Sequence, residues 1–379
     1  MRRLLLLVSA IVACDTTFFT ALTPLLPHYA DRFGLSKAEA GVLVATYAAG
    51  ALLGAIPGGI VTSHWGPKRA VLIGLTLMSV SSVGFALAGD VSTLSLSRLV
   101  QGFGSVFSWS GGLAWLISAA PRERRGELLG TAMGAAVFGA LLGPVLGAIA
   151  GVVGARIAFL AVAGLGVVLI AWAAATPGAP REPQQLREGL RALRGRQIYA
   201  GAWLIVLPAL LFGVLIVLVP LRLNSYGWGT LAIGAVFLAT TALEVVLNPL
   251  LGRLTDRRGR LQPVRVALLA SIGVSVALAW VHQPMLIVPL VLAAGIAYGA
   301  FYTPGLALIS DGAETQGVAK GLAFGLMNAG WAVGAILGPA VGGALASIAG
   351  DALPYLLMAG LCLATYVATR ARFAQPATT

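Results

Sequence analysis

Two matching stretches, one in each half of the chain, decide the architecture: Gly139-Ala-Leu-Leu-Gly-Pro-Val-Leu-Gly147 and Gly334-Ala-Ile-Leu-Gly-Pro-Ala-Val-Gly342. The second repeats the first at an offset of 195 residues. Each lies in an apolar run long enough to cross a bilayer as a helix. Gly139 and Gly143 lie four residues apart, on one helix face, so a second backbone can approach there, and Pro144 bends the helix. We expect the motif to pack two helices together, and the second stretch supplies the same small residues and proline: Gly334, Gly338 and Pro339.

The composition excludes a water-soluble globule. Of the 379 residues, 58% are hydrophobic and only 10% are charged, whereas soluble domains carry about 25% charged residues. Most of the surface must therefore face lipid, which predicts an all-α integral membrane protein. The net charge of +12 sits in short loops between apolar runs, so we expect no nucleic-acid partner. The sequence gives no sign of a metal site, a cofactor or a disulfide framework.

Twelve runs have the length of a transmembrane helix, and a polar interval separates the first six from the last six. We predict two pseudo-symmetric six-helix bundles at residues 1–175 and 199–379, joined by a linker at 176–198. The expected spans lie near 4–27, 39–63, 70–89, 92–119, 127–150, 155–175, 199–221, 229–251, 264–282, 285–309, 321–348 and 353–369.

The lysines and arginines predict the orientation. Twenty of them fall on the side that holds both termini and the linker, four fall on the other side, and Arg98 lies within a span. Such an excess marks the cytoplasmic side. We therefore predict a multi-pass protein of the plasma membrane with both termini in the cytoplasm.

A second repeat lies in the loops after the second and eighth spans, at an offset of 193 residues. Gly59-Ile-Val-Thr-Ser-His-Trp-Gly66 aligns with Gly252-Arg-Leu-Thr-Asp-Arg-Arg-Gly259. A lone acidic residue among arginines adds nothing to topology, so we interpret Asp256 as one side of a conformational latch. In the first loop serine stands at this position, which leaves a latch and a plain basic loop equally open there.

These motifs resemble those of the major facilitator superfamily, in particular its twelve-span drug–proton antiporters. The loop motif is matched in the second half by Gly252, Asp256, Gly259 and Arg260, and in the first half by Gly59, Gly66, Lys68 and Arg69, with Ser63 in place of the family's aspartate. A fourth-span motif is matched by Arg98, Gln101, Gly102 and Gly104, and the fifth-span antiporter motif by the run from Gly130 to Gly147. The resemblance implies a transporter that works by alternating access and a part for Arg98 in proton relay; a structural counter-ion is the equal alternative.

Two carboxylates lie deep inside predicted spans. Asp15 and Glu244 fall near the bilayer midplane, one in each half, by the rise of a helix from the nearest span end. A charge there is costly and therefore marks a functional site by default. Because burial disfavours the charged form of a carboxylate, either residue can take up and release a proton. A structural hydrogen-bonded pair is the alternative for each.

Further residues are predicted to line a central cavity. Thr241, Glu244 and Asn248 share one helix face. Other candidates are Phe19, Gln101, Tyr298, Tyr302, Asn328 and Trp331. Simple packing is the alternative for the aromatic residues.

We predict proton-coupled export of small lipophilic, cationic compounds by a monomer. A metabolite facilitator or proton symporter of the same superfamily is the alternative. The chain carries no HExxH, GxSxG or Walker A pattern, which argues against a membrane enzyme.

Overall fold

The computed structural model describes the chain except residues 122–123, 179–194, 259–260, 317–319 and 372–379. Within the helices, the side chains of 125–126, 248–258, 261, 320–324 and 370–371 also lie outside the described part. The described elements are helices: α1 (Arg2–Thr20), α2 (Leu22–Phe33), α3 (Lys37–His64), α4 (Pro67–Leu87), α5 (Val91–Ala119), α6 (Arg125–Val153), α7 (Ala155–Ala175), α9 (Arg196–Ser225), α10 (Thr230–Arg258), α11 (Leu261–Trp280), α12 (Pro284–Gly299), α13 (Tyr302–Thr315), α14 (Lys320–Ala349) and α15 (Ala352–Ala371).

Each predicted span corresponds to a helix or to a pair of helices, so the prediction of a twelve-span all-α membrane fold is confirmed. Two spans expected as single helices are each divided, into α1 and α2 and into α12 and α13. The breaks follow from Pro24 and Pro304, because a proline lacks the N–H that bonds the carbonyl four residues earlier and its ring clashes with that carbonyl. Those carbonyls belong to Thr20, the last residue of α1, and Ala300, the residue after α12.

Eleven stretches of the described chain are long and apolar enough to cross a membrane, and the two divided spans each count as one. The remaining span, α5, is not among them, because polar residues interrupt it. Several of these polar side chains are buried: Ser97, Arg98, Gln101, Ser105 and Ser108. Such an inward polar face makes α5 the first candidate for a functional site in unit 1.

The helices form two compact units. Unit 1 comprises Met1–Leu35, Leu43–Leu186 and Trp228–Leu238; unit 2 comprises Ser36–Val42, Arg187–Gly227 and Ala239–Thr379. The predicted boundaries at 175 and 199 differ from these units in two places. The first turns of α3 belong to unit 2, and the first turns of α10 belong to unit 1. The division into two six-helix bundles stays a prediction.

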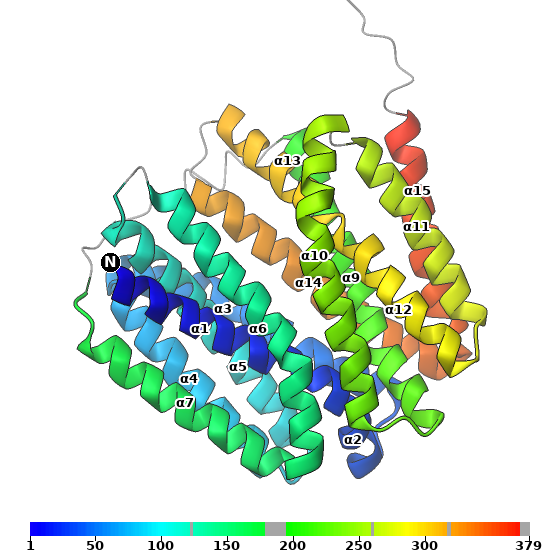
Figure 1. The fold of residues 1–379 in the computed structure, drawn as a ribbon, viewed down its shortest axis with the longest axis horizontal. Helices are drawn as coiled ribbons and strands as arrows, with labels where there is room; N and C mark the ends of the chain where they lie inside the picture. Colours follow the sequence, from blue (N-terminus) through cyan, green and yellow to red (C-terminus); the bar gives the residue numbers. More distant parts are fainter. Residues whose placement is uncertain (122–123, 179–194, 259–260, 317–319, 372–379) are drawn as a thin grey trace, which may run out of the picture. The chain divides into compact units, whose positions relative to one another are not determined.

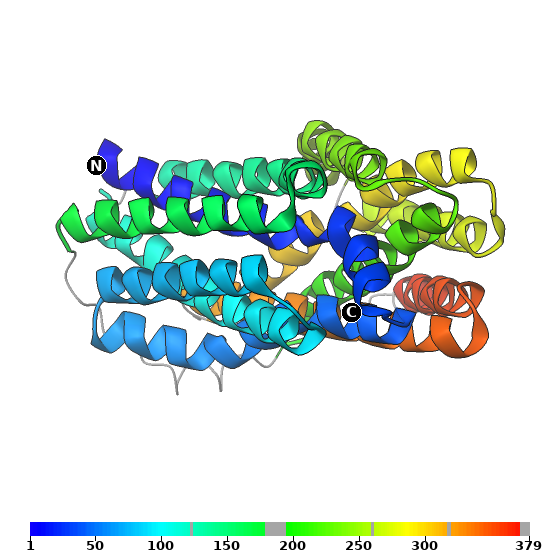
Figure 2. The same ribbon diagram turned by 90° about the horizontal axis from the view of Figure 1, so that it is seen from below.

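The two units repeat the same helix pairs. In unit 1, α1 packs on α6 and α4 packs on α7; in unit 2, α9 packs on α14 and α11 packs on α15. The last pair is easily followed in Figure 1, and α4 with α7 in Figure 2. These pairs occupy corresponding places in the two halves of the chain, as expected for a duplicated transporter bundle.

The repeated glycine motif lies where α6 packs on α1 in unit 1 and where α14 packs on α9 in unit 2. A Cβ on Gly139 would fall on the Ala13 carbonyl of α1, and a Cβ on Gly334 would lie 2.5 Å from the Val206 carbonyl of α9. Pro144 cannot donate to the Ala140 carbonyl, which instead accepts a hydrogen bond of 3.3 Å from the Thr20 hydroxyl of α1. The motif thus lets two backbones touch and satisfies the carbonyl that proline leaves open.

Candidate functional site

Asp15 is the centre of a polar cluster inside unit 1. It lies on α1 and only 1% of its surface is exposed. Its Oδ2 atom accepts hydrogen bonds from the Ser105 hydroxyl at 2.6 Å and the Trp109 indole N–H at 2.9 Å, and the Tyr47 hydroxyl lies 3.5 Å away. Its Oδ1 atom is buried and has no hydrogen-bond partner within the described residues. The carboxyl group is therefore held by one oxygen, while the other, buried oxygen keeps its lone pairs free to accept a proton.

Arg98 lies beside this cluster, also fully buried, but its hydrogen bonds go elsewhere. Its Nη1 atom donates to the Gln101 side-chain oxygen at 2.9 Å and to the Phe19 carbonyl at 3.2 Å. The guanidinium carbon lies 5.1 Å from the ring centre of Tyr47 and 5.4 Å from that of Phe19. Aromatic faces attract a desolvated cation. Tyr47 thus borders both charges, with its hydroxyl toward Asp15 and its ring under Arg98.

Sequence reasoning missed two members of this cluster, Tyr47 and Trp109. Trp109 carried a usable signal, because it extends the helix face of Arg98, Gln101 and Ser105 by one further turn. Tyr47 carried none, since it lies in an apolar run of α3 and meets Asp15 only through the packing of α1, α3 and α5.

Glu244 is a partly buried residue of unit 2. It lies on α10, opposite two glycines of α12. A Cβ on Gly295 would lie 2.8 Å from its Oε1 atom, whereas a Cβ on Gly299 would lie 3.7 Å from its carboxyl carbon. Gly295 therefore makes the room that this carboxyl group occupies, and Gly299 leaves a margin around it.

Aromatic side chains gather near Glu244. Tyr302, the first residue of α13, lies three residues after Gly299. Its ring stacks on that of Phe212 of α9, with 6.5 Å between the ring centres and 11° between the ring planes. Tyr302 and Trp331, both half-buried, also pack on the same buried core residues, Ile205, Ile309 and Ala313. Glu244 and Tyr302 thus border one region of unit 2 that combines a carboxyl group with aromatic faces.

Other predicted cavity-lining residues have different surroundings. Tyr298 is fully buried, and its hydroxyl forms a hydrogen bond of 2.9 Å with that of Ser275 on α11; its place in a cavity stays a prediction. Gln101 is likewise buried, and its side-chain oxygen accepts a hydrogen bond from Arg98. Phe19 and Thr241 are half-buried and Asn328 is exposed. The side chain of Asn248 lies outside the described residues.

The first-half loop motif contacts the end of α7 through Lys68, a role different from that of a latch. Gly66 has a φ of 93°, which glycine adopts without strain, and this turn joins α3 to α4. Lys68 donates from Nζ to the carbonyls of Ala174 and Thr176, both at 2.7 Å, and so caps the end of α7. Arg69 is exposed, Gly59 has open space around it, and Ser63 bonds within its own helix. In the second half, the surroundings of Gly252 and Asp256 and the whole of Gly259 and Arg260 lie outside the described part of the chain.

The latch hypothesis for Asp256 gives a prediction. Asp256→Asn is expected to shift the balance between inward- and outward-facing states, because it removes the charge that the surrounding arginines can hold. Ser63→Asp is expected to shift the same balance, whereas Ser63→Asn, which adds the shape without the charge, leaves it unchanged. Distance distributions between spin labels on the two halves measure these populations. Identical distance distributions in Asp256→Asn and the unaltered protein would contradict the latch hypothesis.

Comparison with known proteins decides the family. The family model of the Major Facilitator Superfamily matches residues 6–324. The chain belongs to this superfamily. It is therefore a multi-pass membrane protein of a transporter superfamily.

Individual members of the superfamily match parts of the sequence. The quinolone resistance protein NorA of Staphylococcus aureus (strain MRSA252) is 31% identical over 107 residues, which are 28% of each chain. The MFS-type transporter ppzB of Metarhizium rileyi is 30% identical over 122 residues, 31% of this chain and 25% of that protein. The matched segments thus cover little more than a quarter of these relatives.

Solved structures of the superfamily match nearly the whole fold. A bacterial homologue of the human lysosomal transporter Spinster, inward-facing and unoccupied, matches with a TM-score of 0.81 at 15% identity and covers 97% of this chain and 96% of that one. The D-xylose–proton symporter matches with a TM-score of 0.75 at 18% identity and covers 96% of both chains. At these identities the likeness shows the fold alone.

Proposed function

We propose that this superfamily member exports small lipophilic cations across the plasma membrane in exchange for protons, by alternating access. The observation that carries the proposal is the Asp15 carboxyl group, which is buried in a membrane-spanning helix with one oxygen hydrogen-bonded and the other without a partner in the described structure. In this proposal Asp15 and Glu244 couple proton and substrate movement, and the glycine and loop motifs take part in the conformational change, as predicted from the sequence.

The proton step rests on the surroundings of Asp15. An ionised carboxylate is expensive at the bilayer midplane unless it is paired. The described ion pairs include none with Asp15. Arg98 is near enough to stabilise the ionised form but is hydrogen-bonded to Gln101 and Phe19, so it does not hold Asp15 permanently in that form. Such a carboxyl group is suited to bind a proton in one state and release it in another.

The substrate class rests on Glu244 and its neighbours. A carboxylate attracts a cation, and aromatic faces such as that of Tyr302 add a further attraction of about 0.5–2 kcal/mol each. The apolar and aromatic residues around Tyr302 (Phe212, Ile205 and Ile309) favour a lipophilic molecule. The match to a quinolone resistance protein also supports export of drugs.

A metabolite facilitator or proton symporter is the competing function, because the D-xylose–proton symporter shares the fold. Purified protein in liposomes with an imposed pH gradient separates these functions, with cationic, neutral and anionic dyes as probes. We expect the gradient to drive cationic dyes uphill, toward the side with more protons, and to leave anionic dyes unmoved. If a dye instead equilibrates across the membrane at a rate that does not depend on the pH gradient, the protein is a facilitator and the proposed export is wrong.

The proposed orientation gives a labelling prediction. Both native cysteines, Cys14 and Cys362, are buried, so the signal comes from introduced ones. Single cysteines at Ser92 and Asn224, in the terminal turns of α5 and α9, are expected to react with a membrane-impermeant reagent from outside intact cells. Cysteines at Gln262 and at Glu188, which lies outside the described residues, are expected to react only after permeabilisation. The reverse pattern would invert the topology.

A further inference from the structure

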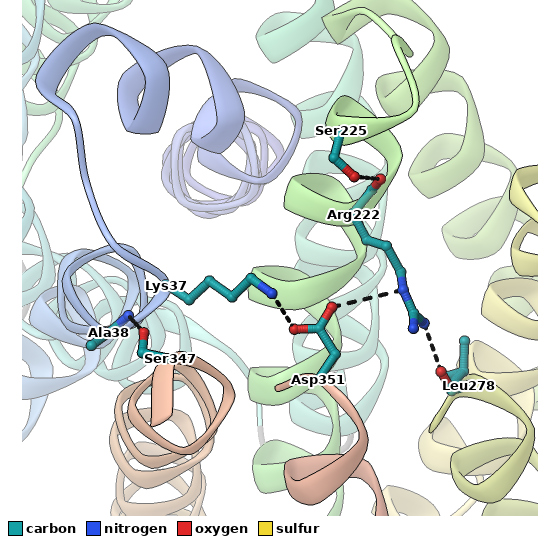
Figure 3. Close-up of polar contacts among 7 residues, drawn as sticks. All are labelled: Lys37, Ala38, Arg222, Ser225, Leu278, Ser347 and Asp351. Carbon is teal, nitrogen blue, oxygen red and sulfur yellow. Dashed lines mark hydrogen bonds and ion pairs between the residues drawn. The ribbon is translucent and has the colours of Figure 1, made fainter. Parts of the chain in front are cut away.

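Three charged side chains that the proposed cycle does not use meet at one end of unit 2 (Figure 3). Lys37 is the first residue of α3, Arg222 lies in the last turn of α9, and Asp351 lies between α14 and α15. Asp351 lies between the two cations: its Oδ1 accepts from Lys37 Nζ, and its Oδ2 lies 3.7 Å from Arg222 Nε. One carboxylate therefore serves two cations.

This cluster is one negative charge short. Arg222 is almost wholly buried, with 8% of its side chain exposed, and its Nη1 atom donates to the Leu278 carbonyl at 2.6 Å. A carbonyl satisfies a donor but does not neutralise the guanidinium charge, and burying a charge without full compensation is costly. Lys37 directs one ammonium group, with three donors, at a single carboxylate oxygen. The side chains thus carry an excess of one positive charge and spare donors.

The excess charge borders a pocket. A cavity of about 460 Å³ is lined by all three charged residues together with polar and aromatic neighbours, among them Tyr226, Trp280 and His282. This volume lies within the range of pockets that hold small molecules, about 300–1,000 Å³. Trp280 and Tyr226 remain 65% and 41% exposed. We call this cavity the terminal pocket.

The depth of the terminal pocket in the membrane follows from the helix ends. Its lining includes the last residues of three candidate spans, Ser225, Trp280 and Ala349, and the first residue of a fourth, Ala352. Span ends lie at the level of the lipid headgroups, where exposed tryptophan and tyrosine side chains concentrate. The pocket therefore opens where lipid phosphate groups are abundant.

We propose that the terminal pocket binds the phosphodiester headgroup of an anionic membrane lipid. A phosphodiester carries the single negative charge that the cluster lacks, and arginine and lysine are the usual donors to phosphate oxygens. The apolar faces of Trp280 and Tyr226 suit the glycerol and the first methylenes of the acyl chains. Asp351 limits the affinity, because it competes with the phosphate for Lys37.

Thermal unfolding of the purified, delipidated full-length protein tests the proposal. We expect phosphatidylglycerol in mixed micelles to raise the midpoint, and phosphatidylcholine and the soluble headgroup glycerophosphoglycerol not to raise it. Lys37→Gln is expected to require about tenfold more phosphatidylglycerol, the effect of losing one charged hydrogen bond. Asp351→Asn is expected to require less lipid than the unaltered protein. Arg156→Gln, which removes an exposed cation on the same predicted side of the membrane, is the matched control and should leave the titration unchanged.

The outcomes separate the possible ligands. Equal stabilisation by phosphatidylcholine, or a weaker lipid response in Asp351→Asn, would overturn the phosphate site and leave a structural ion cluster. Equal stabilisation by glycerophosphoglycerol would overturn the assignment to a lipid in favour of a soluble phosphate ester. Because Asp351→Asn is expected to strengthen binding, a loss of folding in Lys37→Gln does not prevent a decision.

Discussion

Replacing Asp15 with asparagine is expected to reduce transport driven by a pH gradient to the level of protein-free liposomes. Asparagine keeps the shape of the side chain, and its oxygen still accepts from Ser105 and Trp109, so the local packing is preserved. It cannot bind or release a proton. Uptake of a fluorescent cation under an imposed gradient measures the loss.

Two further measurements make this result specific. Exchange of labelled for unlabelled substrate at equal pH needs no net proton movement, so we expect Asp15→Asn to retain it. Ser105→Ala removes one hydrogen bond from the same carboxyl group but leaves it titratable, so it should slow gradient-driven transport without abolishing it. Full gradient-driven transport by Asp15→Asn would make Asp15 structural and Glu244 the leading proton carrier.

Replacing Glu244 with glutamine is expected to weaken transport of cations more than that of neutral compounds. A charge-assisted hydrogen bond contributes about 1.5–3 kcal/mol, so the KM for a cation should rise by about 10- to 100-fold. For a neutral compound of similar size it should change little, because glutamine fills the same volume. KM values for a matched cationic and neutral dye pair provide the measurement.

The glycines of α12 offer a matched steric control for Glu244. Gly295→Ala places a methyl group 2.8 Å from Glu244 Oε1 and against Thr240, so the carboxyl group must move. Gly299→Ala meets the same side chain at 3.7 Å, an ordinary contact. We expect the first variant to raise the KM for cations and the second to leave it unchanged. Equal behaviour of the two variants would show that the position of the carboxyl group is unimportant for substrate binding.

The spans and the repeated motif could be predicted from the sequence because their signals are local. An apolar run of sufficient length and a proline or glycine at a fixed offset need no knowledge of the partner helix. The interruption of the first and tenth spans could not be predicted in this way: Pro24 and Pro304 mark breaks, but Pro57, Pro144 and Pro208 lie inside unbroken helices.

The contacts that make the candidate sites could not be predicted in this way. Tyr47 lies 32 residues from Asp15 in the chain, and Lys37 lies 314 residues from Asp351. Whether a buried carboxylate is paired depends on which faces of several helices meet, and the periodicity of one helix does not contain that information. The sequence therefore identified Asp15, Arg98 and Glu244 as unusual, while the hydrogen bonds around them required the structure.

The most direct test of proton exchange is the pH inside liposomes during substrate efflux. Liposomes containing the transporter and a trapped pH indicator are loaded with a cationic substrate and diluted into substrate-free buffer at the same pH, with the membrane potential clamped. As substrate leaves, protons should enter, so the lumen is expected to acidify with the unaltered protein and to stay constant with Asp15→Asn. Substrate efflux at constant lumenal pH, or with a rise in lumenal pH as protons leave together with the substrate, would contradict the exchange of cations for protons.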